Sequence, residues 1–319
     1  MILALQYYNG DREAAFRLAR LLADLEPRPR FDVILALCCQ PDTTIDDETV
    51  CVIEECSRKF AVEHVVSQYG CTGWADGSGQ LWRGTVTHFL NSQIYSRYPY
   101  NVIFTFDGSD GVPLHVNWID LTVHEHYRTR AAGKRVTGLL NLDVPEYPHV
   151  HGNMIFDLDF AREHPTLFDT PLGASAEEWW RIWDVYHAHV FLSEVRPSSV
   201  VCNHWNRQGV TEAIMDAAAR ESIWLHGYKD LELADVARRR LLVTLEGKST
   251  TPVLRRQDQL VPAALQKARD NAARIGYGLS KKVCDPRVCD PRVCDLKVCD
   301  PKVCDPRVCD PKVCDPRST

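Results

Sequence analysis

The stretch NVIFTFDGSD, residues 101–110, decides the expected fold of this chain. Its first six residues are mostly apolar, and two carboxylates, Asp107 and Asp110, follow at once. A strand interior tolerates ionised side chains poorly, so these carboxylates must lie beyond the end of the strand, in solvent or on a metal ion. Hard oxygen ligands at such a place suit Mg²⁺ or Mn²⁺, although both side chains could instead form a turn that caps the helix after His115.

Apolar runs of similar length recur along the first 140 residues. Candidate strands cover residues 2–8, 32–38, 62–67, 101–106 and 135–140. Between them, apolar residues return at helical spacing over 14–25, 47–60, 81–95 and 115–131. This alternation predicts an α/β fold whose mainly parallel sheet is flanked by helices on both faces. Ligands bind such sheets outside the carboxyl ends of the strands.

The order of elements becomes mixed beyond residue 140. Further strands are expected at 153–158, 199–203 and 223–225, and further helices at 176–190 and 210–221. Core packing explains the cluster of Trp179, Trp180 and Trp183 better than a sugar-stacking surface does. The polar and aromatic residues 203–206 could line an acceptor pocket or form a simple loop.

The overall composition excludes several classes of protein. A formal net charge of −6 argues against a generic nucleic-acid binder, although it leaves room for a local basic groove. No apolar run approaches 18 residues, so we expect no transmembrane helix. The start, MILALQYYNGD, lacks a basic region and a cleavage site, which favours a buried strand over a signal peptide. Cysteines without a secretion signal favour the cytoplasm.

The cysteines mark a separate C-terminal tail. Seven of the 13 cysteines lie in a repeat of period five, Val-Cys-Asp-Pro-Arg/Lys, over residues 283–317. An odd count leaves one cysteine unpaired in any intramolecular scheme, and the spacing is looser than in zinc sites. The repeat resembles pentapeptide-repeat proteins, but Pro occupies the centre of six of its seven units and removes a backbone donor there. We expect an extended tail, a short docked coil or an element that joins the protein into a homo-oligomer.

Three further motifs could contribute chemistry. WLHGYKD, residues 224–230, offers His226 as an imidazole ligand and Lys229 as a phosphate-reaching cation, or else forms a solvated loop. HVHGNM, residues 149–154, is expected to be a polar loop in which Gly152 lets the backbone approach a ligand. The Gly-rich stretch 73–82 fits a ligand-covering loop, and it matches neither a dinucleotide-binding fingerprint nor a P-loop.

Together these motifs resemble a glycosyltransferase with the GT-A fold. In that family, an Asp-x-Asp-type motif after a strand holds a divalent metal on the diphosphate of a nucleotide-sugar. A later Gly/Asn segment contacts the sugar, and a late His completes the metal site near a Lys. Asp107 and Asp110, the segment 151–153, and the pair His226 and Lys229 match these parts in order. One departure is that two residues, not one, separate the aspartates.

The resemblance implies a GT-A-like, Rossmann-like fold and a hexosyltransferase-type enzyme that moves a sugar from a UDP- or GDP-sugar to an acceptor hydroxyl. Its metal, Mn²⁺ or Mg²⁺, would be bound by Asp107, Asp110 and His226. The expected donor-binding residues are Gln6, Tyr7, Asn9, Asp76, Asp107, Gly152, Asn153 and Lys229. An inverting enzyme also needs a general base, for which Asp143, Glu146 and Asp157 are candidates, whereas a retaining enzyme does not.

The resemblance covers roughly residues 1–240 and implies a division of the chain. Residues 1–140 would form the nucleotide-sugar-binding half, 141–245 the acceptor-side half, and 246–282 a linker or packing arm before the tail 283–317. The acceptor would be a glycan or a hydroxymethylated base in phage-type DNA. A DNA acceptor would need a basic groove, for which residues 128–135 and 238–240 are available, and a phage enzyme would act in the host cytoplasm. The alternative is a non-catalytic nucleotide-binding or scaffold protein that assembles through the tail.

Overall fold

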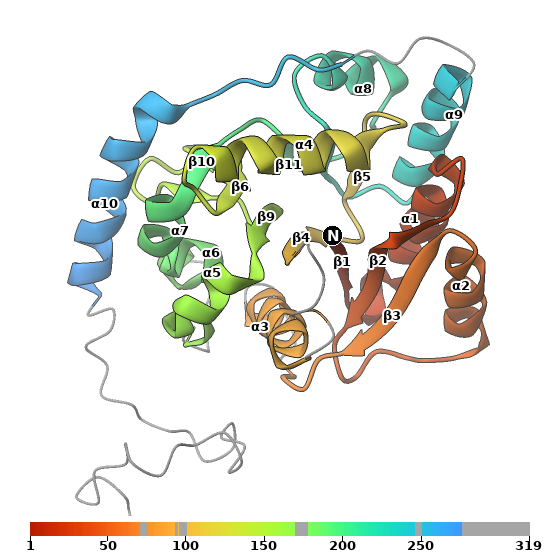
Figure 1. Ribbon diagram of the computed structural model, residues 1–319, viewed down its shortest axis with the longest axis horizontal. Coiled ribbons are helices and arrows are strands. Elements are labelled where there is room, and N and C mark those ends of the chain that lie inside the picture. Colours follow the sequence, from red (N-terminus) through yellow and green to blue (C-terminus); the bar gives the residue numbers. More distant parts are fainter. Residues whose placement is uncertain (71–75, 93–94, 96–100, 170–177, 246–250, 276–319) are drawn as a thin grey trace, which may run out of the picture. The chain divides into compact units, whose positions relative to one another are not determined.

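A seven-stranded sheet in the order β10-β6-β9-β4-β1-β2-β3 forms the centre of the protein (Figure 1). The computed structural model describes residues 1–70, 76–92, 95, 101–169, 178–245 and 251–275. These residues all belong to one unit, Met1–Gly278. The predicted repeat tail, 283–317, lies outside the described residues, as do residues 71–75 of the predicted Gly-rich loop.

The sheet is mixed and mainly parallel. Its strands are β1 (Ile2–Tyr7), β2 (Arg30–Cys39), β3 (Phe60–Val66), β4 (Val102–Asp107), β6 (Val136–Gly138), β9 (Met154–Asp157) and β10 (Val195–Pro197). Strands β3, β2, β1 and β4 run parallel, β9 runs antiparallel to both β4 and β6, and β10 runs parallel to β6. Gln6 pairs with Asp107, so the carboxyl ends of β1 and β4 lie side by side.

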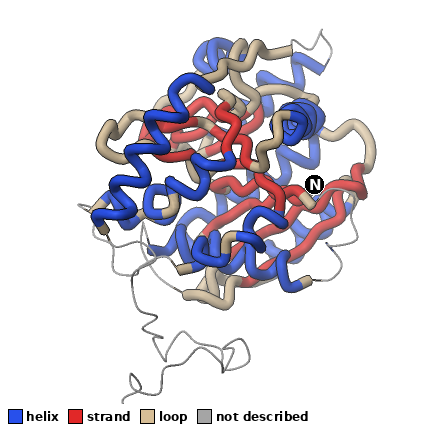
Figure 2. Tube along the Cα trace, turned by 60° about the vertical axis from the view of Figure 1, so that its left-hand side comes forward, coloured by secondary structure: helices blue, strands red, loops and turns tan. Residues whose placement is uncertain are grey.

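Helices cover both faces of this sheet (Figure 2). They are α1 (Arg12–Leu25), α2 (Asp47–Ser57), α3 (Asp76–Asn91), α4 (Trp118–Ala131), α5 (Leu158–Glu163), α6 (Trp183–Tyr186), α7 (Ala188–Glu194), α8 (Glu212–Ala219), α9 (Leu233–Leu245) and α10 (Val261–Arg274). Alternate residues of β1 enter opposite hydrophobic cores, Leu3 and Leu5 on one face and Ile2 and Ala4 on the other. The predicted α/β fold, a mainly parallel sheet flanked by helices, is therefore confirmed.

Two smaller sheets complete the strand arrangement. The first has the order β11-β12-β5 and joins β11 (Val201–Arg207), β12 (Trp224–Tyr228) and β5 (Gly111–Pro113). The second pairs β7 (Leu140–Asn141) with β8 (His149–Val150). Only residues 108–110 separate β4 in the large sheet from β5 in the three-stranded sheet. This short connection places Asp110 where the two sheets meet.

Several element boundaries differ from those expected. The predicted strand 135–140 divides into β6 and β7, and the predicted helix 115–131 begins only at Trp118. The described part of the predicted helix 176–190 is broken into a 3-10 turn, Trp179–Arg181, followed by α6 and α7, because Ile182 has an extended backbone. Residues 176–177 lie outside the described residues. The short strands β5 and β10 and the helices α5 and α9 were not among the expected elements.

The described residues 251–275 lie against the rest of the unit. The backbone N–H of Val253 donates to Arg220, and Ser199 exchanges hydrogen bonds with Arg255. Helix α10 packs on α7, and its buried face is formed by Ala264, Ala268 and Ala272. Among the described helices, none has the length and apolar character needed to cross a membrane.

Candidate functional site

Four polar side chains meet where β4 leaves the large sheet. Asp107 is the last residue of β4, Asp110 lies just before β5, and His226 lies within β12. Since β5 pairs with β12 so that His226 is opposite Gly111, the pairing brings the imidazole to both carboxylates. Lys229 follows one residue after the end of β12. The structure thus brings together the acidic motif and the late His and Lys that were predicted from sequence.

The distances in this cluster fit a metal centre. His226 Nε2 lies 3.1 Å from Asp110 Oδ1 and 3.4 Å from Asp107 Oδ2. One ligand atom from each of the three residues lies within 4.8 Å of the other two. The side chains of Asp110 and His226 are 3% and 4% exposed, whereas that of Asp107 is 47% exposed. The cluster is therefore buried on one side and open to solvent at Asp107.

Charges within the cluster shift its pKa values strongly. Burial alone raises the pKa of Asp110, but His226 and Lys229 lower it by more, so that it lies well below its usual value. Burial lowers the pKa of His226, yet Asp110 and Asp107 outweigh this and raise it to about 9. Lys229 Nζ lies 2.6 Å from Asp110 Oδ2, which raises the pKa of Lys229 against the effect of burial. The Asp110 carboxylate is therefore ionised and partly neutralised by nearby cations.

Buried polar atoms without hydrogen-bond partners gather around this cluster. Within the described residues, Asn153 Nδ2 and Asp184 Oδ1 have none, and Asp110 Oδ1 and His226 Nε2 have only their mutual ion pair and the contact of His226 with Asp107. Nearly all buried polar atoms in proteins are hydrogen-bonded, so such a gathering indicates that a polar ligand completes the site. Two carboxylate groups and one imidazole form a donor set suited to Mn²⁺ or Mg²⁺. Asp107, Asp110 and His226 could hold such an ion.

The segment predicted to contact a sugar lies beside the acidic motif. Asn153 Oδ1 accepts a hydrogen bond from the backbone N–H of Asp107 at 3.2 Å, which leaves its Nδ2 buried and without a partner among the described residues. Thr105 Oγ1 donates to the carbonyl of Gly152 at 3.2 Å. The ring of His151 packs edge-on against His226, with centroids 4.6 Å apart. Burial lowers the pKa of His151 well below its usual value, so this imidazole is neutral.

Asp184 is a further acidic residue at the site that was not predicted. It lies on α6 and is 8% exposed. A side-chain Cβ at Gly152 would come within 3.3 Å of Asp184 Oδ2, and His149 Nε2 is 4.0 Å from that oxygen. Burial raises the pKa of Asp184, while His149 lowers it. The signal in the sequence was an isolated acid among apolar residues, WDVY, which we attributed to a core helix.

The other predicted donor residues follow β1 or begin α3. Gln6 Nε2 donates to Thr85 at 3.2 Å, and Asn9 Oδ1 accepts from the backbone of Thr44 at 3.2 Å. Asp76 is the first residue of α3. Gln6 pairs with Asp107 in the sheet. Their role in donor binding stays a prediction.

Tyr7, a predicted donor-binding residue, and its neighbour Tyr8 have different surroundings. Tyr7 is buried, packs edge-on against Phe16, and directs its hydroxyl to His64 at 3.3 Å. Tyr8 is half exposed instead. Asp11 raises the pKa of Tyr8 and Lys229 lowers it, which places the Tyr8 hydroxyl near both charges. Side chains alternate along a strand, so a shift of one residue decides which tyrosine faces the site.

Of the three predicted general bases, Asp157 lies at the opposite end of β4 from this cluster. Asp157 pairs with Val102 at the amino end of β4, whereas Asp107 lies at the carboxyl end of the same strand. Its carboxylate bonds to His126 at 3.2 Å and to Arg130 at 3.4 Å. Asp143 and Glu146 are exposed on the segment between β7 and β8. The structure therefore does not bring Asp157 to the site.

The basic clusters considered for DNA binding are engaged in ion pairs. Arg128 pairs with Glu125, Arg130 with Asp157, and Arg135 with Glu163 and Glu194. The second cluster is paired in the same way, Arg238 with Asp24, Arg239 with Glu212 and Arg240 with Asp216. Carboxylates thus neutralise the cations that a DNA backbone would need to contact.

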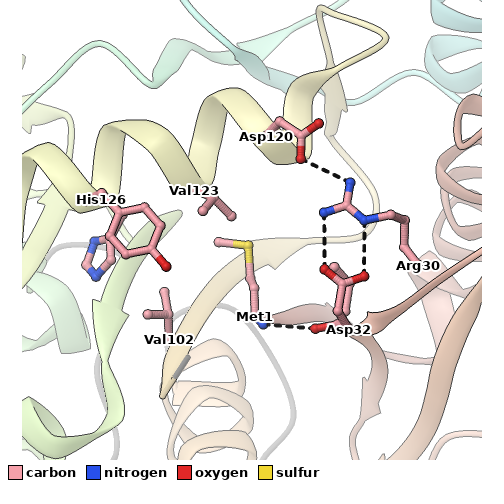
Figure 3. A pocket seen from close by; sticks show the side chains of 9 residues that line it. Met1, Arg30, Asp32, Val102, Asp120, Val123 and His126 are labelled. Atoms are coloured by element: carbon pink, nitrogen blue, oxygen red, sulfur yellow. Dashed lines mark hydrogen bonds and ion pairs between the residues drawn. The ribbon is translucent and has the colours of Figure 1, made fainter. Parts of the chain in front are cut away.

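A cavity of about 140 Å³ lies at the amino ends of β1, β2 and β4 (Figure 3). Met1, Val102 and Val123 contribute apolar walls. Arg30 Nη1 donates to Asp120 at 3.0 Å, and its Nε lies 3.2 Å from Asp32 (Figure 3). Because Val102 begins the strand that Asp107 ends, the cavity is remote from the metal cluster. Its charged lining residues satisfy one another, so we assign the chemistry to the carboxyl ends of the strands.

The chain is similar to several solved structures. No family model matches the chain, and no curated protein matches it in sequence. Solved structures of similar fold include a WbbM bifunctional glycosyltransferase, with a TM-score of 0.45 and 10% identity over 71% of this chain and 45% of that one. A TarS structure from S. aureus has a TM-score of 0.42 and 10% identity over 88% of this chain and 75% of that one. A galactosyltransferase, LgtC, in complex with donor and acceptor sugar analogs has a TM-score of 0.39 and 8% identity over 86% of this chain and 96% of that one.

These solved structures are at most 10% identical to this chain, and their TM-scores lie below 0.5. The chain spans less than half of the WbbM chain that it matches. The chemistry proposed next rests on the geometry of the site.

Proposed function

We propose that the protein is a metal-dependent glycosyltransferase that moves a sugar from a nucleotide-sugar to an acceptor hydroxyl. One observation carries this proposal: two carboxylates, an imidazole and an ammonium group converge at the carboxyl end of β4, with buried polar atoms that lack partners among the described residues. A diphosphate with a divalent cation supplies the charges that such a set of groups recognises. The strand-end location is where α/β sheets bind ligands.

Each residue of the site has a distinct task in this proposal. Asp107, Asp110 and His226 would hold Mn²⁺ or Mg²⁺, and such an ion would supply Lewis-acid stabilisation of negative charge on a diphosphate. Lys229, next to Asp110, adds a second positive charge for the phosphate oxygens. Asn153 would direct its free Nδ2 donor to the donor sugar, and Gly152 leaves room for the sugar because any larger side chain would meet Trp183 and Asp184.

Asp184 is our candidate for the group that acts on the reactive face of the sugar. The glycosyl group develops positive charge as its bond to the diphosphate breaks, and a nearby carboxylate stabilises this charge. An inverting enzyme also needs a general base for the acceptor hydroxyl, and a buried carboxyl with a raised pKa suits that task. The position of Asp184 against Gly152 places it on the expected sugar side, which favours it over Asp143, Glu146 and Asp157.

A carbohydrate acceptor is favoured over DNA. The arginines at 128–135 and 238–240 that could have formed a basic groove are paired with carboxylates. Binding to DNA draws its affinity from cations that neutralise phosphates, and breaking several ion pairs would offset that gain. We therefore propose a neutral glycan hydroxyl as the acceptor.

The test measures turnover of UDP- and GDP-sugars by the full chain with Mn²⁺, using release of the nucleoside diphosphate as the readout. We expect one donor to be hydrolysed slowly, and Asp107→Ala and His226→Ala to abolish this activity. Asp258→Ala, which changes an exposed carboxylate away from the cluster, serves as the control. Nucleotide binding in thermal-shift measurements without turnover of any donor would instead support a nucleotide-binding protein. Absence of both would refute the proposal.

A further inference from the structure

Strand β11 contributes a side chain that contacts the proposed metal ligand His226 on the side of its ring away from the carboxylates. Strands β11 and β12 run parallel, and their register places Asn203 opposite His226. Across this pair, Asn203 Oδ1 lies 3.0 Å from His226 Nδ1. The backbone pairing therefore fixes a side-chain contact on the side of the imidazole that faces away from Asp107 and Asp110.

When His226 binds a metal ion through one ring nitrogen, this contact decides which nitrogen keeps its proton. A neutral imidazole has one N–H and one nitrogen lone pair, and only the lone pair can bind a metal ion. An amide oxygen only accepts hydrogen bonds, so it holds the proton on Nδ1. The lone pair is then on Nε2, the atom that lies 3.1 Å from Asp110 and 3.4 Å from Asp107.

The surroundings of His226 leave this orientation little freedom. His226 Nε2 is buried and faces the carboxylates of Asp110 and Asp107, so the ring is aimed at the position that a shared metal ion would fill. The ring of His151 packs against that of His226 on another side. The contact with Asn203 holds the opposite ring nitrogen, Nδ1.

We propose that Asn203 is a positioning residue for the metal centre, which sets the tautomer and ring orientation of His226. This inference rests on the proposed metal site and extends it to a strand that contributes no ligand. Hydrogen bonds to the second nitrogen of a metal-binding histidine typically change metal affinity by about 10-fold to 100-fold. Asn203 thereby acts on the cation through His226 and touches no reacting group.

The experiment measures Mn²⁺ affinity of the full chain without nucleotide, by electron paramagnetic resonance of the free ion at constant pH. Asn203→Leu should weaken binding by about 10-fold to 100-fold, because Nδ1 loses its acceptor. Asn203→Asp should bind Mn²⁺ at least as tightly as the natural chain, because a carboxylate is a stronger acceptor for the same N–H. Asn206→Gly is the control, since it removes an amide from the same strand and glycine tolerates the positive φ of 57° found there.

The outcomes separate this inference from the proposed function. Unchanged affinity in Asn203→Leu, or weaker binding in a folded Asn203→Asp, would overturn the role of Asn203 while the metal site stands. If the Leu variant fails to fold, the Asp variant alone decides the question. Lack of Mn²⁺ binding by the natural chain would remove the metal site and this inference together.

Discussion

Lys229 makes the affinities for metal and nucleotide depend on each other. Its ammonium lies 2.6 Å from Asp110, which is a proposed metal ligand, so the lysine repels a cation at the same place. A nucleoside diphosphate would interact with both positive charges and relieve that repulsion. Coupling of this kind is reciprocal, because each ligand must raise the affinity of the other by the same factor.

We expect Lys229→Gln to act in opposite directions on the two ligands. Mn²⁺ alone should bind about threefold to tenfold more tightly, since one nearby positive charge is lost. Affinity for a nucleoside diphosphate should fall about 10-fold to 100-fold, the value of a hydrogen bond between charged groups. Titration calorimetry measures both constants, and Arg207→Gln, an exposed cation on β11, is the control for net charge. A fall in both affinities would show that Lys229 only supports the local structure.

Asp184→Asn tests the acid on the sugar side. The amide keeps the shape of the side chain but can neither accept a proton nor stabilise positive charge. Sugar transfer should fall by about 10² to 10⁴, the usual contribution of a positioned acid or base. Binding of Mn²⁺ and of the donor should change little, because Asp184 is not among the cluster's ligands. Full activity in this variant would exclude Asp184 from the reaction.

Glu26 gives the folded protein a dependence on pH that is separate from the site. Burial raises the pKa of Glu26 from 4.5 to about 7, although Arg30 lowers it. The folded chain therefore binds more protons than the unfolded chain between these two values, and stability falls as the pH rises through that window. The contribution is at most about 3 kcal/mol.

Glu26→Gln should remove this loss of stability at rising pH, because the amide does not titrate. Thermal unfolding between pH 5 and pH 8 should show a smaller decrease in Tm for the variant than for the natural chain. Glu54→Gln changes an exposed carboxyl on α2 and should leave the decrease unaltered. Parallel curves for Glu26→Gln and the natural chain would contradict the assignment.

At the residue scale, the sequence could identify candidate metal ligands but not the residues that contact them. Asp107, Asp110, His226 and Lys229 could be predicted because polar groups that follow apolar runs must lie at strand ends. Asp184 was hidden, since a buried acid in a tryptophan-rich stretch looks like part of a core helix until Gly152 is found beside it. Contacts between residues distant in sequence depend on topology, which local patterns do not contain.

At the scale of elements, Gly227 fixes how β12 presents its histidine. Its φ is +101°, and a Cβ there would lie 2.5 Å from the backbone carbonyl carbon of His204. A side chain would therefore meet both an unfavourable backbone conformation and the neighbouring strand β11. His226 is the preceding residue, so displacement of the strand would also move the imidazole.

We expect Gly227→Ala to lower stability by about 3 kcal/mol or more and to weaken Mn²⁺ binding. Gly209→Ala is a matched control, because Gly209 also has a positive φ, +72°, but no atom lies within 4 Å of its Cβ position. That control should cost about 1 kcal/mol, the strain of the backbone alone. Chemical denaturation measures both values, and equal losses would show that contact with β11 is unimportant.

Prediction of elements succeeded where apolar runs were long and failed where they were short. The strands around residues 2–8 and 32–38 were found because five or more consecutive apolar residues can only be buried. Strands β5 and β10 have three residues each, too few to show any periodicity. The break at Ile182 was equally hidden, because the flanking tryptophans fit a continuous helix until tertiary packing is known. Trp183, for example, stacks on Trp82 at 4.5 Å.

At the scale of the molecule, α10 holds the segment 142–148 in place. Asn271 Nδ2 donates to the carbonyl of Glu146 at 2.8 Å, and Arg274 lies 3.4 Å from the Tyr147 hydroxyl. The helix packs on α7 through Ala268, which is 4% exposed. Small side chains there let the two helices approach closely.

Ala268→Asp should release this helix. A carboxylate at a buried position without a partner should cost about 2–4 kcal/mol, observed as a lower Tm and faster proteolysis within residues 251–275. If the segment 142–148 contacts the acceptor, KM for the acceptor should rise while donor affinity is retained. Ala263→Asp, at an exposed position of the same helix, should leave these properties unchanged. Equal protease resistance in both variants would contradict the proposed packing role.

The short connection between β4 and β5 gives the proposed cation a mechanical consequence. Asp107 belongs to the large sheet and His226 to the three-stranded one. An ion held by both would cross-link two sheets that the three residues 108–110 and the packing of Trp224 on Phe106 also join. Amide hydrogen exchange in β5 and β12 should then slow when the metal binds, while exchange in β2 and β3 stays constant. The metal centre would in that case stabilise the contact between the two sheets in addition to its proposed role in the reaction.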